Sequence, residues 1–409
     1  MTTSAILALA TGLPVVATRH SGFPDQVLDG KTGFLSNEND YKDFATAILK
    51  YLAEPKKWPA MSHASRAHAL AMYDCRPLIG RQIEHYRRLA PWVKKVAFVL
   101  GPFPVVSETF IINQIADLID QGLDVRIYAF NKFGEANISD RYFQYKMAER
   151  TTYLELPSNI FLRVDKAIPK FLHVLLRRPK ALGIIFDFKK YGLSGLSLKP
   201  LFWVEPFIGL KADVVHCHFG RTANRYLFIR RALGLPQPFI TTFYGFDISN
   251  LVQVKGPRYY DDLIREGTDF LVMSNNMKER VAAIGFSPDR MDVLPISEDI
   301  ESFVFKERTL GDNEVTRLVS VGRFVEKKGF DDVIKAMKIV KEKYQRPFIC
   351  SIIGGGELED ELRALAKTEG VEDVVKFEGF MKVQDVTKFL LKSHLYIQGS
   401  KTAANGDME

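Results

Sequence analysis

The sequence predicts an α/β protein with two domains, each built on a parallel sheet. The chain has 409 residues, which is too long for one ordinary core, and 46% hydrophobic residues with 30 Phe and 15 Tyr are typical of packed domains. Short apolar runs alternate with helical periods from Lys95 onward, as in parallel sheets with crossover helices. The alternation starts again after Pro295, which indicates a second domain.

The elements follow in order along the chain. Before Pro295, strands are expected at 96–100, 125–130, 214–218 and 239–243, with a helix near 108–121. After it, strands are expected at 317–321, 348–353, 374–378 and 395–398, with helices at 331–344, 358–368 and 383–391. Ligands bind at the carboxyl ends of strands in open parallel sheets, so we expect both domains to face a site.

The two ends of the chain look incomplete in complementary ways. The last strand, 395–398, is followed by a loop without a covering helix, whereas the first residues form a helical stretch at 4–10 and a strand at 14–18. Joined end to end, they restore the order strand, loop, helix, strand. We therefore predict a circular permutation, in which residues 1–89 complete the domain of residues 295–409, while residues 93–294 form the other domain. An accidental joining of gene fragments or a truncation is the alternative origin.

The composition excludes several classes of protein. Three distant cysteines cannot form a disulfide framework, which suits a cytoplasmic location. The start lacks the basic region of a secretory signal, and the most apolar stretch, 171–188, is interrupted by four charged residues. The net charge of +7 is compatible with phosphates, nucleic acid or anionic lipid and selects none of them.

Four segments in the second domain follow strands and suit a phosphate-bearing ligand. Residues 322–329 (GRFVEKKG) place cations and a helix start at one point, where a diphosphate can be held as a leaving group. The glycines of 354–356 permit a close backbone approach to a ligand, although such a turn is by itself more often structural. The segment 377–380 (FEGF) ends the next strand, and 405–409 (NGDME) follows the last one.

Two segments in the first domain carry comparable signals. Residues 101–111 (GPFPVVSETFI) form a proline-rich loop before a helix, with Ser107 as the expected N-cap. Residues 241–247 (TTFYGFD) end a strand. Another strand ends with His216 and His218, and we expect these two side chains to point to opposite faces, which argues against metal binding by the pair.

Together these motifs resemble the retaining glycosyltransferases of family 4, with the two-domain GT-B fold, and in particular the bacterial exopolysaccharide (colanic-acid type) glycosyltransferases. The resemblance covers nearly the whole chain in rotated order. It implies two Rossmann-like domains with parallel sheets facing a cleft. It also implies transfer of a sugar, with retention, from a nucleotide diphosphate sugar to a glycan or lipid-linked acceptor in polysaccharide biosynthesis.

The resemblance assigns roles to residues of the second domain. Arg323 and Lys328, beside Gly322, would bind the donor diphosphate. The donor, a UDP- or GDP-sugar, would also meet four further positions: Gly355, Gly356, Glu378 and Gly379. Glu409 matches the first carboxylate of the Glu-x7-Glu motif and would contact the donor sugar, but Leu7 stands where the second carboxylate would hold the ribose. No cofactor and no metal are expected.

In the first domain the resemblance points to acceptor contacts. Ser107 and Glu108 belong to a segment similar to the FPxxSETFI signature, and His218 is the better acceptor candidate of the two histidines. Tyr244 takes the histidine position of a His-Gly-x-Asp motif, whose Asp247 is retained. Because tyrosine does not titrate near neutral pH, Tyr244 keeps a role in the cleft without a histidine's chemistry.

The segment 163–199 carries nine basic residues against two acidic ones, interleaved with Phe, Leu and Ile. This pattern fits a peripheral contact with an anionic membrane at its inner face, and equally a helical insertion with a solvated basic face. Nucleic acid is not expected, because no binding module accompanies the charge. Two readings remain besides an active enzyme: a permuted or truncated, catalytically impaired protein that at most binds nucleotide or glycan, and a swapped oligomer completed by residues 1–90 of a neighbour.

Overall fold

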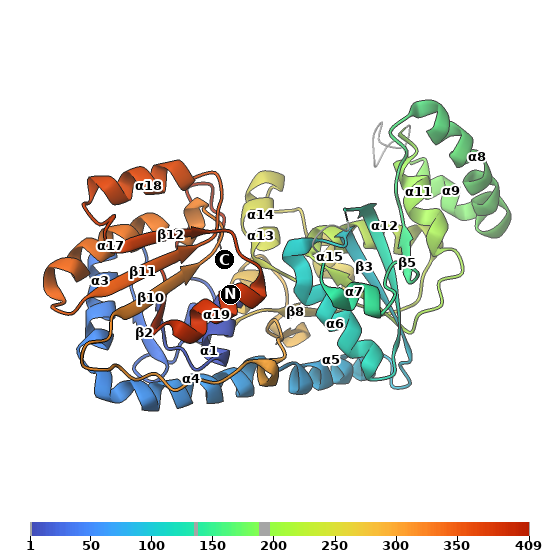
Figure 1. Cartoon of the computed structure of the whole chain (residues 1–409). Helices are drawn as coiled ribbons and strands as arrows, with labels where there is room; N and C mark the ends of the chain where they lie inside the picture. Colours follow the sequence, from blue (N-terminus) through green and yellow to red (C-terminus); the bar gives the residue numbers. More distant parts are fainter. Residues whose placement is uncertain (1, 135–137, 188–196, 409) are drawn as a thin grey trace.

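The computed structural model describes residues 2–134, 138–187 and 197–408. Within them, two parallel sheets form two α/β domains (Figure 1). The first sheet has six strands in the order β12-β11-β10-β13-β1-β2, and we call its domain the six-stranded domain. The second has seven strands in the order β5-β4-β3-β6-β7-β8-β9, and its domain is the seven-stranded domain. The predicted fold class, two parallel α/β domains, is confirmed.

The six-stranded domain takes strands from both ends of the chain. Its strands are β1 (Val15–Thr18), β2 (Gly33–Ser36), β10 (Thr316–Val321), β11 (Phe348–Ile353), β12 (Val375–Gly379) and β13 (Leu395–Gln398). Strand β13 pairs in parallel with β1, where Val15 lies opposite Tyr396, and on its other side with β10. The permuted order and the domain boundaries stay predictions.

Helices cover both faces of this sheet. One face packs against α3 (Tyr41–Leu52), α17 (Phe330–Lys343) and α18 (Glu359–Thr368). The other packs against α1 (Thr3–Ala10), α4 (Trp58–Tyr73) and α19 (Val383–Lys392). Every residue from Ala5 to Ala10 is buried, because α1 lies between the sheet and two helices. The short α2 (Phe23–Gln26) follows β1.

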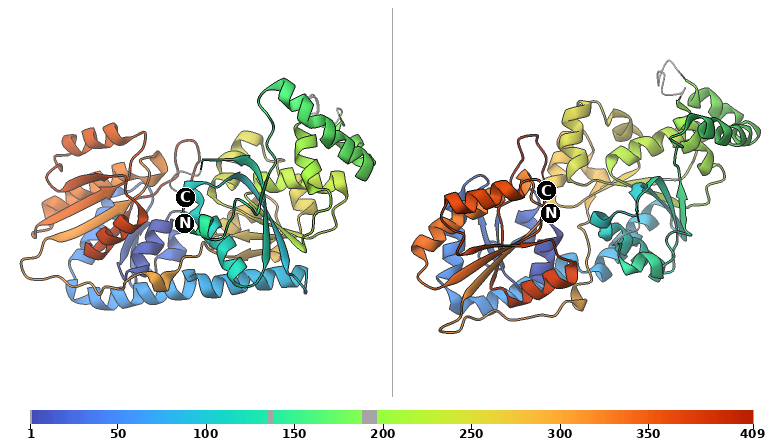
Figure 2. Two further views of the ribbon diagram at one scale, coloured as in Figure 1. Left: turned by 45° about the vertical axis from the view of Figure 1, so that its right-hand side comes forward. Right: turned by 45° about the horizontal axis from the view of Figure 1, so that its top comes forward.

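The seven-stranded domain contains β3 (Lys95–Phe103), β4 (Asp124–Lys132), β5 (Thr151–Tyr153), β6 (Val214–His218), β7 (Phe239–Thr242), β8 (Asp269–Val272) and β9 (Met291–Val293). One face of its sheet packs against α5 (Cys75–Leu89), α6 (Thr109–Asp120) and α7 (Asp140–Gln144). The other face and its rim carry α8 (Ile160–Arg177), α9 (Pro179–Ile185), α11 (Lys199–Val204), α12 (Gly220–Leu233), α13 (Gly245–Ile248), α14 (Asn250–Lys255), α15 (Asp261–Glu266) and α16 (Asn275–Ala283). Figure 2 shows this domain from two further sides.

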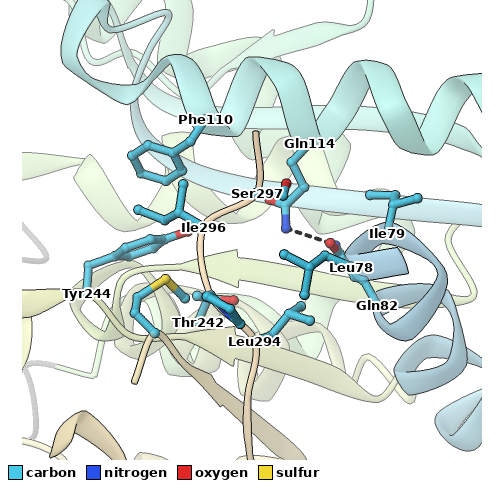
Figure 3. Close-up of a pocket in the computed structure, with 12 residues that line it drawn as sticks. Leu78, Ile79, Gln82, Phe110, Gln114, Thr242, Tyr244, Leu294, Ile296 and Ser297 are labelled. Atoms are coloured by element: carbon cyan, nitrogen blue, oxygen red, sulfur yellow. Dashed lines mark hydrogen bonds between the residues drawn. The ribbon is translucent and has the colours of Figure 1, made fainter. Parts of the chain in front are cut away.

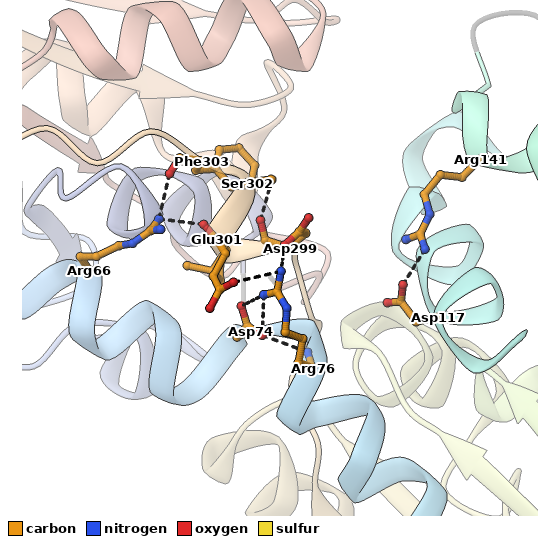
Figure 4. A network of polar contacts seen from close by, with 10 residues as sticks. Arg66, Asp74, Arg76, Asp117, Arg141, Asp299, Glu301, Ser302 and Phe303 are labelled. Carbon is orange, nitrogen blue, oxygen red and sulfur yellow. Dashed lines mark hydrogen bonds and ion pairs between the residues drawn. The ribbon is translucent and has the colours of Figure 1, made fainter. Parts of the chain in front are cut away.

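Two chain segments cross between the domains and pair with each other. The first crossing joins α4 to α5 at Asp74, and the second lies near Glu298. The Cys75 N–H donates to the Glu298 carbonyl at 2.9 Å, and the Glu298 N–H donates to the Tyr73 carbonyl at 2.9 Å. Arg76 ties the two crossings together, because its guanidinium pairs with the carboxylates of Asp74 at 2.8 Å and Asp299 at 2.9 Å (Figure 4).

Candidate functional site

Three neighbouring strands of the six-stranded sheet end in a junction of glycines. The Gly322 N–H donates to the Ile353 carbonyl at 3.0 Å, and the Gly354 N–H donates to the Gly379 carbonyl at 3.0 Å. A Cβ on Gly354 would lie 1.8 Å from the Gly322 carbonyl oxygen, so the ends of β10 and β11 approach as only glycine permits. The junction lies at the carboxyl edge of the sheet, where open α/β folds bind ligands.

The loop after β11 packs on the segment that follows β10. The Phe324 N–H donates to the Gly355 carbonyl at 2.9 Å. A Cβ on Gly356 would lie 2.7 Å from the Phe324 carbonyl oxygen. At the end of β12, a carboxylate oxygen of Glu378 accepts a hydrogen bond from the Ser351 hydroxyl at 2.8 Å. The structure therefore brings the donor-side positions of the sequence analysis to one edge of the sheet.

The cations of the 322–329 segment lie in different environments. Arg323 is exposed, and no other described side chain pairs with it. The stem of Lys328 lies over Gly322, with its Cδ 3.2 Å from the position of a Cβ there. Lys327, by contrast, forms an ion pair with Asp407 at 3.0 Å. An exposed guanidinium beside bare backbone is suited to bidentate binding of a phosphate.

The segment after β13, residues 399–408, folds back onto this junction. Glu326 accepts a hydrogen bond from the Ala404 N–H at 3.0 Å, and Lys401 pairs with Asp331 at 2.7 Å. The same loop reaches the other domain, because the Asn250 side chain donates to the Asn405 carbonyl at 3.3 Å. The loop thus lies between the domains, while Glu409, the expected first carboxylate, falls outside the described residues.

The first turn of α1 reaches the same edge of the sheet. The Ser4 hydroxyl donates to the Val321 carbonyl at 3.3 Å and shares a hydrogen bond of 2.8 Å with the Tyr396 hydroxyl. Leu7, one turn further on, is 6% exposed and belongs to the apolar cluster between α1 and the sheet. An apolar side chain therefore stands where the resemblance expects a ribose-binding carboxylate.

A small pocket opens on the seven-stranded domain, close to the crossing segments (Figure 3). Its volume is about 20 Å³, enough for a water molecule. The lining residues come from α5, α6, the ends of β7 and β8, and the second crossing: Leu78, Ile79, Gln82, Phe110, Gln114, Thr242, Tyr244, Met273, Leu294, Pro295, Ile296 and Ser297.

Tyr244 lines this pocket and contacts a histidine on the neighbouring strand. Its hydroxyl lies 2.9 Å from His218 Nδ1. Burial raises the pKa of Tyr244 well above its usual range, and the carboxyls of Glu108 and Asp247 raise it further. Burial also lowers the pKa of His218, helped by His216, so the imidazole is neutral at pH 7. The pair can exchange one hydrogen bond but carries no charge.

The expectation that His216 and His218 point to opposite faces is wrong. Their ring centroids are 4.5 Å apart, because residues two apart on a strand share a face and Cys217 takes the other. His216 continues a buried polar chain: Nδ1 lies 2.6 Å from the Tyr86 hydroxyl and Nε2 2.6 Å from the Thr242 hydroxyl. Burial, with a contribution from His85, lowers the pKa of His216 to about 3. Among the described residues, no group of three metal-ligating side chains gathers here or elsewhere.

Asp247 holds the loop that carries Tyr244. Its carboxylate accepts hydrogen bonds from the backbone N–H of Gly220 at 2.7 Å and of Tyr244 at 2.9 Å, which closes a capping box on α13. Burial raises the pKa of Asp247 to about 7, although these hydrogen bonds act in the opposite direction. The carboxylate is 1% exposed, so it positions the loop and does not face the pocket directly.

The predicted N-cap at Ser107 is wrong. A short 3₁₀ helix, Val106–Glu108, precedes α6, and Glu108 is the residue before the first helical residue, Thr109. Helix ends with a 3₁₀ turn commonly shift by one or two residues from a pattern-based boundary. Burial raises the pKa of the Glu108 carboxyl to about 7, so this acid lies close to half-protonated near neutral pH.

Sequence reasoning missed the two amides of the pocket. Gln114 on α6 donates to Gln82 on α5 at 2.6 Å, and this pair lies beside the second crossing (Figure 3). Gln82 is 2% exposed and interrupts an apolar helix face formed by residues such as Ile79 and Ile83. A polar residue inside an otherwise apolar stripe was the signal available, since buried amides need partners.

The model of the family Glycosyl transferases group 1 matches residues 3–68 and 303–406, which both lie in the six-stranded domain. The amylovoran biosynthesis glycosyltransferase AmsK of Erwinia amylovora is 30% identical over 319 residues, covering 77% of this chain and 77% of that protein. WcaL of Escherichia coli K12, a glycosyltransferase assigned to colanic acid biosynthesis, is 29% identical over 319 residues, again covering 77% of this chain and 77% of that protein.

Solved structures of similar fold include the Anabaena protein HepE in complex with UDP and glucose. It has a TM-score of 0.48 and 12% sequence identity, with 76% of this chain and 75% of that chain covered.

Proposed function

Because the chain belongs to the group 1 glycosyltransferases, we propose that it transfers a sugar from a nucleotide diphosphate sugar to a glycan or lipid-linked acceptor in exopolysaccharide synthesis. AmsK and WcaL are named for the synthesis of such polymers, which supports this acceptor class. We further propose a GT-B transferase of family 4 that retains the anomeric configuration, with a permuted chain order.

The glycine junction with the exposed Arg323 is the observation that carries the proposal. Three strand ends leave bare backbone at Gly322, Gly354 and Gly379, and a guanidinium without a described partner stands beside them. When the bond from the sugar to the diphosphate breaks, negative charge grows on the leaving phosphate oxygens. Arg323 and Lys328 would neutralise that charge, which lowers the barrier for departure.

The acceptor would bind against the mouth of the pocket around Tyr244, whose interior has room only for a water molecule. The pocket lining combines the Tyr244 and Thr242 hydroxyls with the Gln114 amide, so it can exchange hydrogen bonds with sugar hydroxyls. The loop 399–408 contacts Asn250, which follows the Tyr244 loop, so both sites share the space between the domains. Asp247 and His218 would position Tyr244, and Glu108 would add a carboxyl near it.

A second candidate function rests on Leu7. Its apolar side chain leaves no ribose carboxylate from α1, so the protein would bind nucleotide or glycan and turn over slowly. Losing a charge-assisted hydrogen bond of about 1.5 to 3 kcal/mol weakens donor binding by roughly tenfold to a hundredfold. A Leu7→Glu variant with strongly raised transfer rates would favour this candidate over the first.

Thermal unfolding with UDP, GDP and their sugars tests the proposal. A nucleotide at about 100 times its dissociation constant stabilises the folded protein by about 2.7 kcal/mol, and the responding base identifies the donor to use in a transfer assay. Arg323→Ala should abolish the shift, whereas Arg258→Ala, an exposed arginine of the other domain, should leave it unchanged. A wild-type protein that unfolds cooperatively with no shift from any nucleotide would contradict the proposal.

A further inference from the structure

A two-helix arm projects from the seven-stranded domain on the side away from α4 and α5 (Figures 1 and 2). We call it the α8 arm; it consists of α8 and α9. Helix α8 packs on the rest of the seven-stranded domain along one narrow face, where Ala167 is 6% exposed and Val174 is fully buried. The remaining circumference of this 18-residue helix faces away from the domain.

The outward face of α8 is apolar. Its exposed large hydrophobic side chains are Ile160, Phe161, Leu162, Val164, Ile168, Phe171, Leu172, Leu175 and Leu176. Phe161 is 82% exposed and Leu176 80% exposed. At 3.6 residues per turn, positions 161, 164, 168, 172 and 175 fall on one side of the helix, about a third of a turn from the face that packs on the domain. A continuous apolar face of this kind in water marks an interaction site.

Cations lie on the polar side of α8 and where α8 meets α9. Lys166, Arg177, Arg178 and Lys180 form no ion pair with any described residue, whereas Lys170 is held by Glu205 at 2.6 Å. Within 160–180, Asp165 is the one acidic residue. The helix therefore combines an apolar side that avoids water with a basic side that is attracted to a negative surface.

We propose that the α8 arm docks on an anionic lipid bilayer, with its apolar face inserted among the acyl chains and its cations against lipid phosphates. An amphipathic helix with an apolar side and a basic polar side lies in the membrane interface in this way. Within the described residues no helix is long and apolar enough to cross a bilayer, so the arm lies on the surface. The apolar face of α8 is separate from the glycine junction. The proposal adds to the proposed function the place where the protein would act, which is a membrane surface.

Charge favours a bilayer over a second copy of the chain. In a symmetric dimer the two apolar faces would meet, and Lys166 and Arg177 on the other side of each helix would gain no partner. No carboxylate except Asp165 lies on the segment, so a second copy supplies little charge that complements these cations. Anionic headgroups supply the missing charge over the whole face.

Co-sedimentation with lipid vesicles tests the proposal. Wild-type protein should bind vesicles containing about one quarter phosphatidylglycerol, bind pure phosphatidylcholine weakly, and lose most binding when NaCl rises from about 0.1 to 0.5 M. The variant Phe161→Ser/Ile168→Ser/Leu172→Ser/Leu176→Ser should bind at least about tenfold more weakly. Because all four side chains are exposed, its unfolding temperature should stay close to that of the wild type.

A matched control changes apolar residues that are exposed elsewhere. Trp92 and Val304 are 86% and 65% exposed and lie outside the arm, so Trp92→Ser/Val304→Ser should bind vesicles like the wild type. The proposal is overturned if wild-type protein stays in the supernatant or if the arm variant binds equally well. It is also overturned if light scattering shows that the wild type is a dimer and that, of the two variants, only the arm variant is a monomer. Nucleotide binding at the glycine junction is measured separately and does not depend on either result.

Discussion

Arg308 is a charged side chain with only 1% of its surface exposed, and it joins segments that are far apart in the chain. Its guanidinium donates to the carbonyls of Thr11 at 3.1 Å, Ser393 at 2.8 Å and Leu390 at 3.0 Å. These carbonyls belong to the C-terminal ends of α1 and α19, where a cation also meets the negative end of each helix dipole. Arg308 therefore connects the first and last helices of the six-stranded domain.

Replacing Arg308 by methionine should destabilise this domain strongly. The variant keeps the volume of the stem but leaves buried carbonyls without donors, which costs about 3 to 5 kcal/mol. Chemical denaturation followed by circular dichroism measures the loss. Arg258→Met, at an exposed position, is the control and should change the free energy of unfolding by less than about 0.5 kcal/mol. Equal stability of both variants would show that the Arg308 hydrogen bonds contribute nothing.

Tyr244→Phe should separate packing from hydrogen bonding at the pocket. The ring remains in contact with Phe110 and Phe219, while the hydrogen bond with His218 is lost. We expect kcat/KM for the acceptor to fall about tenfold, the scale of one buried hydrogen bond, with the donor dissociation constant unchanged. Steady-state kinetics with varied acceptor, together with nucleotide titration, provide both readouts. Unchanged acceptor kinetics in this variant would show that the Tyr244 hydroxyl does not contribute to the acceptor site.

At the scale of elements, the start of α17 depends on a glycine with no room for a side chain. Gly329 has φ of +62°, and a Cβ there would lie 1.8 Å from the Gly399 carbonyl oxygen. Gly370, after α18, has φ of +68° with open space around it. The two glycines share a backbone conformation and differ in their surroundings.

The two alanine variants should therefore differ. Gly370→Ala carries only the backbone strain of a left-handed residue, about 1 to 2 kcal/mol. Gly329→Ala adds a collision with the backbone of the 399–408 loop, so we expect a loss of at least about 3 kcal/mol and weaker nucleotide binding. Thermal unfolding with and without nucleotide measures both effects. Equal losses would mean that the loop moves aside freely.

Apolar runs with clear boundaries allowed several elements to be predicted from the sequence. The bounds of β6, β11 and β13 agree with the predicted ranges, because turn-forming or polar residues flank each run. The pocket was harder to predict. Gln82 and Gln114 meet only because α5 of one crossing packs against α6, which is a tertiary contact without a local pattern. The roles of Arg323, Lys328 and Tyr244 depend on the family resemblance and stay predictions.

At the scale of the whole molecule, the paired crossings contain a partly buried acid. Burial, with the nearby Asp117 and Asp299, raises the pKa of Glu298 to about 7. In the unfolded chain this carboxyl titrates near 4.5, so the folded protein holds an extra proton between these values. The contribution of this proton to the free energy of unfolding is fully present below pH 4.5 and is lost as the pH rises through 7.

Glu298→Gln should remove this part of the pH dependence. Relative to the variant, the wild type should lose about 3 kcal/mol of unfolding free energy between pH 4.5 and pH 8. Denaturant unfolding at several pH values measures the difference. The exposed neighbour Glu301→Gln is the control and should follow the wild-type curve. Parallel curves for wild type and Glu298→Gln would exclude Glu298 as the titrating group.

The pairing of β13 with β1 also governs the order in which the chain folds during synthesis. Val15 and its partner Tyr396 are separated by 396 − 15 = 381 residues. At about 5 to 20 residues per second, a ribosome needs roughly 20 to 80 seconds to add that length. The apolar helix α1 and strand β1 therefore have no β13 to pack against until the end of synthesis, by which time the seven-stranded domain is already complete. The six-stranded domain therefore forms last.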